Sequence, residues 1–115
     1  SQSEEDMEEV TAPEEPEKEE QIATKEFQDI PVKVNGLDEK FKGSFQKPED
    51  GMTDLTITAE QNVIDKLEKT DFVIYVDASG VTDEGEQNLP ISVEGPQNVS
   101  WKITDTEAIM HIELA

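Results

Sequence analysis

Apolar and polar residues alternate along most of the chain beyond residue 22. Successive side chains of a β-strand point to opposite faces of the sheet, so this period of two predicts strands with one buried and one solvated face. Turn signals such as Asn35-Gly36 and Gly95-Pro96 separate the runs. The alternating runs cover residues 30–34, 41–46, 54–58, 89–93, 99–103 and 108–114. Residues 72–76 (FVIYV) are apolar at every position, which predicts a central strand covered on both faces.

One stretch has a different period. In residues 59–67, Val63, Ile64 and Leu67 fall at helical spacing, and Thr58 is suited to cap the start of a helix. We therefore expect a helix of two to three turns that packs onto a sheet. With about seven strands and one short helix, the fold class is mostly β, built on a small core.

The acidic residues concentrate at the start of the chain and give a domain boundary. Residues 1–21 hold ten acidic residues and one Lys, a net charge of −9, which leaves −11 of the total −20 for residues 22–115. A segment this charged, with only Met7 and Val10 as large apolar residues, cannot offset the entropy lost on ordering. We interpret residues 1–21 as an acidic disordered linker or arm and residues 22–115 as one domain. The alternative for the arm is a docking tail for a basic partner.

The charge also excludes classes of partner. Proteins that bind nucleic acids or anionic membranes use clusters of Lys and Arg, whereas this chain has nine Lys, no Arg and a net charge of −20. No run is apolar enough to span a bilayer or to act as a signal peptide, so any membrane anchor is expected outside this chain. Without Cys, there is no disulfide framework and no thiolate site.

The side chains that could act in catalysis or bind a metal form no recognisable catalytic or metal site. His111 is the only His; it lies beside Glu113 on the polar side of the last run, and we expect it at the surface. Four acidic residues lie near Gly80 and Gly85: Asp77, Asp83, Glu84 and Glu86. Carboxylates on a loop could hold calcium, but their spacing does not match a calcium-binding loop. A polar loop that connects two strands is therefore favoured. The serines lack a nucleophile-elbow context. We therefore predict no catalytic, cofactor or metal site, and no enzymatic activity.

Four aromatic residues have competing interpretations. Trp101 shares its parity with Val99 and Ile103, which favours a core anchor over an exposed contact for a partner. Tyr75 is expected to be half-buried with a solvated hydroxyl. Phe41 and Phe45 lie near a predicted sheet edge and could belong to the core or stack on another domain.

The ordered series of motifs resembles a single YbbR domain over residues 22–115. The matching positions, in order, are Phe27, Ile30-Pro31-Val32, Asn35-Gly36-Leu37, Gln61-Asn62-Val63-Ile64-Asp65-Lys66-Leu67, Val76-Asp77, Gly80, Gly85, Leu89-Pro90-Ile91-Ser92-Val93 and Pro96. The sequence departs from the family at Ala59, where Gly is more usual, and at Thr106, where Pro is common.

The resemblance implies more than the spacing does. YbbR domains are elongated, mostly β structures, similar to the C-terminal β domain of the ribosomal Ctc family. They occur as tandem repeats on the extracytoplasmic side of the bacterial cell membrane, in proteins anchored by an N-terminal transmembrane helix. Those proteins regulate a membrane diadenylate cyclase, which makes cyclic di-AMP. The resemblance therefore implies a non-catalytic regulatory repeat whose partners are the cyclase and neighbouring YbbR repeats, and the alternatives are a ribosome-associated Ctc-like domain and an envelope ligand-binding module.

Overall fold

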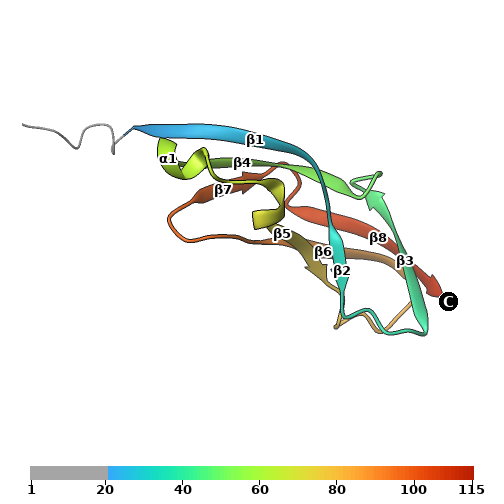
Figure 1. Cartoon of the computed structure of the whole chain (residues 1–115). Helices are drawn as coiled ribbons and strands as arrows, with labels where there is room; N and C mark the ends of the chain where they lie inside the picture. The colour runs from blue at the N-terminus through green and yellow to red at the C-terminus, as the bar shows by residue number, and fades with distance from the viewer. Residues whose placement is uncertain (1–20) are drawn as a thin grey trace, which may run out of the picture.

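A computed structural model of the chain describes residues 21–115, which form two β-sheets in an elongated molecule (Figure 1). The predicted acidic arm lies, except for Gln21, outside the described residues. The fold is mostly β, as the alternation predicts. Among residues 21–115, no helix has the length and apolar character needed to cross a bilayer.

The smaller sheet has three antiparallel strands in the order β1-β4-β7. These strands are β1 (Ile22–Pro31), β4 (Met52–Glu60) and β7 (Ser100–Ile103). In β4, every second residue from Thr53 to Ala59 is buried, while the residues between them face outward. This is the pattern expected of a strand with one face on the core.

The larger sheet has five strands in the order β2-β5-β6-β8-β3. They are β2 (Lys33–Asn35), β5 (Val73–Asp77), β6 (Gly85–Glu94), β8 (Glu107–Leu114) and β3 (Phe41–Lys47). Only the β2–β5 pair is parallel. β1 and β2 are separated by Val32 alone, so a nearly continuous strand passes from one sheet to the other.

Both sheets contribute to a single hydrophobic core. Its largest fully buried side chains come from the central strands: Leu55 and Ile57 on β4, Ile74 and Val76 on β5, and Met110 and Ile112 on β8. Each such side chain contributes roughly 1.5–3 kcal/mol by leaving water. The core therefore holds the two sheets together.

The first strand begins eight residues earlier than the alternation predicts. Two features hide it in the sequence. Lys25 is paired with buried Ile57 and so lies on the core side, where its ammonium sits 5.2 Å from the centre of the Phe27 ring. A bulge between Phe27 and Ile30 then changes the side-chain period; within it, Asp29 has φ 60°.

The predicted helix is shorter than expected, and its predicted cap is wrong. α1 (Gln61–Ile64) is a single turn that follows Glu60, because Thr58 remains in the β4 ladder, where it pairs with both Thr24 and Ser100. A separate 3₁₀ turn, η3 (Lys69–Asp71), follows. The packing prediction is confirmed: Ile64 is buried, and Val63 and Leu67 pack against the core.

The prediction that β5 is covered on both faces is also wrong. Ile74 and Val76 are buried, but Val73 is 37% exposed and Tyr75 is only half-buried. The core covers one face of this strand, and its other face meets solvent. As predicted for Tyr75, its hydroxyl is exposed, and it donates a hydrogen bond of 3.2 Å to Oε2 of Glu94.

Candidate functional site

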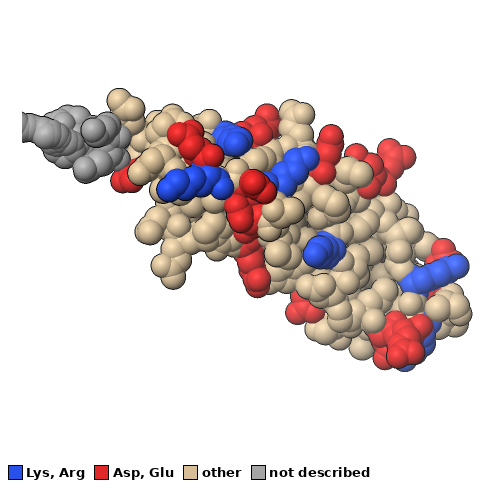
Figure 2. Space-filling view, viewed as in Figure 1, with Lys and Arg blue, Asp and Glu red and all other residues tan. Residues whose placement is uncertain are grey.

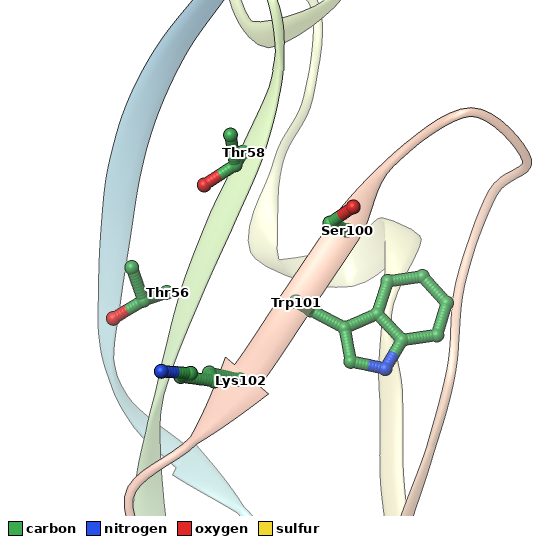
Figure 3. Close-up of a pocket in the computed structure, with 5 residues that line it drawn as sticks. All are labelled: Thr56, Thr58, Ser100, Trp101 and Lys102. Atoms are coloured by element: carbon green, nitrogen blue, oxygen red, sulfur yellow. The ribbon is translucent and has the colours of Figure 1, made fainter.

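A shallow groove lies on the outward face of the smaller sheet, between β4 and β7 (Figure 3). Its volume is about 250 Å³. Strand pairing places Thr56 opposite Lys102 and Thr58 opposite Ser100, and Trp101 also lines the groove. The resulting surface offers hydroxyl groups and one ammonium group. This combination suits polar contacts with another molecule, and it supplies no general base.

Trp101 joins this groove to the core. It is half-buried, and its ring meets Phe72 edge-on, with the ring centroids 5.8 Å apart. Figure 3 shows its side chain directed away from Thr58 and Lys102. Such an aromatic pair stabilises by about 0.5–1.5 kcal/mol beyond its buried area. The prediction that Trp101 anchors the core is confirmed, although the ring keeps partial exposure.

His111 lies on the outward side of β8, as predicted. Its side chain is 43% exposed, and Nε2 is 3.4 Å from Oε2 of Glu113. Ladder pairing places Ser44 of β3 and Glu86 of β6 on either side of it. Among residues 21–115, no hydrogen bond joins His111 to a serine.

The acidic residues near Gly80 do not converge on a cation site. In the described part of the chain, no three His, Asp or Glu side chains are placed to hold a metal ion. Asp77 instead closes a turn, because its Oδ1 accepts the N–H of Ser79 at 2.9 Å. Hydrogen bonds from the side chain and the backbone of Ser79 lower the pKa of Asp77.

The lysines of the sheets lie only on edge strands. β1, β7, β2 and β3 each have one strand neighbour, and they carry Lys25, Lys102, Lys33, Lys42 and Lys47. The interior strands β4, β5, β6 and β8 carry acidic residues and no Lys. Lys on an edge hinders unwanted strand addition, and in an acidic protein it also marks the places where an acidic partner is attracted. Figure 2 shows lysines standing singly among acidic side chains on one face of the molecule.

Phe41 and Phe45 both belong to the edge strand β3, which confirms their predicted location. Phe41 is buried in the core, whereas Phe45, on the same face of β3, is half-buried and packs against the core. Their side chains therefore belong mainly to the domain itself. The confinement of the sheet lysines to edge strands was not predicted from the sequence, because strand order is needed to know which strands form the edges.

Comparison with solved structures identifies the fold. The YbbR-like domain of a Listeria monocytogenes protein superposes with a TM-score of 0.68 at 17% identity, over 80% of this chain and 94% of that one. A YbbR-like protein from Streptococcus pneumoniae TIGR4 gives 0.67 at 15% identity, over 82% of this chain and 48% of the other. A YbbR family protein from Desulfitobacterium hafniense DCB-2 superposes with a TM-score of 0.56 at 14% identity, over 81% of this chain and 98% of that one. No protein-family model matches the chain.

The described part of the chain is a YbbR-like domain, as the sequence resemblance predicted. In sequence, the chain is similar to the CdaA regulatory protein CdaR of Bacillus subtilis strain 168. The two are 36% identical over 81 residues, which are 70% of this chain and 17% of CdaR. The chain thus corresponds to less than one fifth of that relative's length.

Proposed function

We propose that this domain is a non-catalytic regulatory module of a protein that modulates a membrane diadenylate cyclase through protein–protein contact. The observation that carries the proposal is the 36% identity with CdaR, whose name describes a regulator of CdaA. The exposed lysine-bearing edges and the open outward faces of both sheets are surfaces suited to contact with other proteins. The protein would be anchored in the cell membrane by a segment outside this chain, with the domain on the extracytoplasmic side.

The charge distinguishes this proposal from the ribosomal alternative. A Ctc-like domain that contacts RNA needs a basic surface, whereas residues 22–115 carry a net charge of −11. An envelope ligand-binding module would need an aromatic platform or a carboxylate cage. Trp101 is half-buried against Phe72, which disfavours an exposed aromatic platform. Among the described residues, no cluster of His, Asp or Glu is placed to hold a metal ion, which disfavours a carboxylate cage.

The proposed division of labour can be tested in the full-length protein. We expect its membrane helix and adjacent regions to hold the cyclase, while this domain sets spacing or receives a signal from the envelope. Deleting residues 22–115 should therefore change the cyclic di-AMP level while the cyclase still co-purifies. A matched control deletes residues 1–20 and keeps the domain. Loss of co-purification would place the contact with the cyclase in this domain. An unchanged cyclic di-AMP level would show that this domain takes no part in regulating the cyclase.

The non-catalytic part of the proposal has its own test. His111→Ala removes the chain's only imidazole from an exposed position, so it should alter stability by no more than about 0.5 kcal/mol and leave cyclic di-AMP regulation unchanged. The measurements are urea unfolding of the purified chain and the cyclic di-AMP level with the full-length variant. A bound metal that is lost with His111→Ala would contradict the proposal.

A further inference from the structure

An apolar groove of about 330 Å³ lies where the chain leaves the smaller sheet for the larger one. It opens because β2 pairs only with residues 75–77 of β5, so Val73 and Ile74 have no partner on β2. Ile30 and Phe72 line it beside Val73 and Ile74, and Lys33 and Lys69 line it as well. Val73 is 37% exposed, so apolar surface remains open to solvent there.

The two lysines give the groove a charge opposite to that of the whole chain. Within residues 21–115, neither ammonium has a carboxylate within 4.0 Å, since His111–Glu113 is the one ion pair in that part of the chain. A ligand that matches both the apolar lining and the positive charge of this groove carries an apolar side chain between carboxylates. Electrostatic complementarity of this kind selects a partner more than it strengthens binding.

We propose that this groove binds residues 4–10 of the chain itself, with the sequence EEDMEEV. Five of its seven residues are acidic, and Met7 and Val10 are the large apolar residues of the segment before Ile22. Met is well suited to an irregular apolar groove, because its side chain is unbranched and adaptable. The carboxylates beside Met7 would then lie near Lys33 and Lys69. This inference goes beyond the regulatory role and does not depend on it.

The length of chain between this segment and the domain permits the contact. Gln21 is fixed at the start of β1, where its carbonyl oxygen accepts the N–H of Gln61 at 2.9 Å. Ile30 lies nine residues further along an extended strand, about 30 Å away. Residues 11–21 span up to about 36–40 Å when extended, so residues 4–10 reach the groove.

Tethering decides in favour of this occupant over the same segment of a second copy. One apolar side chain and two exposed ion pairs give weak binding between separate molecules. A short flexible connection supplies an effective concentration in the millimolar range, at which weak binding becomes substantial. The contact should also weaken with salt, because the Debye length falls from about 10 Å at 0.1 M to about 3 Å at 1 M.

Paramagnetic broadening tests the proposal on the whole chain. The sequence has no Cys, so Ser3→Cys provides a single position for a nitroxide label. At low salt, the amide signals of Lys33 and Val73 should lose about half their intensity or more, as expected for a segment that spends much of its time on the groove. The loss should disappear in about 1 M salt.

Two charge-reversal variants make the test specific. Lys33→Glu with Lys69→Glu should restore the signals, whereas the control Lys42→Glu with Lys47→Glu, on the β3 edge, should leave the broadening in place. Broadening absent at the groove, or unaffected by reversal at Lys33 and Lys69, would overturn the proposal. Broadening of an unlabelled isotope-enriched chain by a labelled second chain would also overturn it, because the occupant would then come from another copy.

Discussion

Gly95 follows β6 at a position where two aromatic rings approach the backbone. A Cβ added there would lie 2.5 Å from Cδ1 of Phe72 and 3.0 Å from Cζ3 of Trp101. Both rings belong to one packed pair, so neither can withdraw without disturbing the other. This contact explains the need for glycine without any special backbone angle.

Gly95→Ala should lower the free energy of unfolding by about 1–3 kcal/mol, the usual cost of overpacking. Urea unfolding followed by Trp101 fluorescence measures the change. Gly80→Ala is a matched control, because an added Cβ there meets nothing within 4 Å, and it should change stability by less than about 0.5 kcal/mol. Equal effects of the two substitutions would show that the aromatic rings are not the cause.

Asp77 offers a prediction about pH at the same scale. Hydrogen bonds from the side chain and the backbone of Ser79 lower its pKa below the ordinary value. A carboxyl whose pKa is lower in the folded state stabilises the fold above its unfolded pKa. That contribution is lost as the pH falls through the folded value. Ser79→Ala should raise the pKa of Asp77, and a carboxyl NMR titration measures it; an unchanged midpoint would contradict the assigned cause.

Thr53 connects two elements that are distant in the sequence. It lies at the start of β4, is 3% exposed, and donates from Oγ1 to Oδ2 of Asp105 at 2.9 Å. The same oxygen accepts the N–H of Asp105 at 3.2 Å, which fixes the turn between β7 and β8. The sequence pattern did not reveal this pair, because alternation identifies buried positions and not the partners of polar side chains.

Thr53→Val keeps the shape of the side chain but leaves both groups of Asp105 without this partner. The expected loss is about 1–3 kcal/mol in the free energy of unfolding, which chemical denaturation measures. Thr56→Val, on the outward face of the same strand, serves as control and should stay within about 0.5 kcal/mol of the parent. A loss as small as that of the control would show that water replaces the hydrogen bonds without cost.

Element types were predictable where the pattern reflects burial directly. The interior strands β4 and β8 alternate because one face meets the core, so the sequence signals them clearly. The interior strand β5 is apolar on both faces although only one face meets the core, so its pattern indicates a strand but not which face is buried. β1 was predicted only at its end, because Lys25 occupies a core-side position and the bulge at Asp29 breaks the period. The predicted helix was too long because pairing of Thr58 with both neighbouring strands extends β4. The grooves and the lysine-bearing edges depend on strand order, which local patterns do not contain.

At the scale of the whole molecule, residues 21–115 form a packed core among themselves. Deleting residues 1–20 keeps Gln21, whose carbonyl bonds to Gln61. We therefore expect the free energy of unfolding to change by less than about 0.5 kcal/mol. Occupancy of the groove for half the time would contribute only about 0.4 kcal/mol, within that limit. Thermal and urea unfolding of the two chains measure this, and a larger drop would mean that the deleted residues form part of the core.

The chain enters the described part at one end of the long axis and leaves it at the other, with β1 and β8 running along that axis (Figure 1). A pull on the two ends is therefore directed along the strands. The hydrogen bonds of an antiparallel ladder lie perpendicular to its strands, so the pull loads in shear the bonds between β1 and β4 and those that join β8 to β6 and β3. We expect an optical-tweezers experiment to show one abrupt rupture; gradual peeling at low force would contradict this. Such a domain would transmit tension as a stiff spacer.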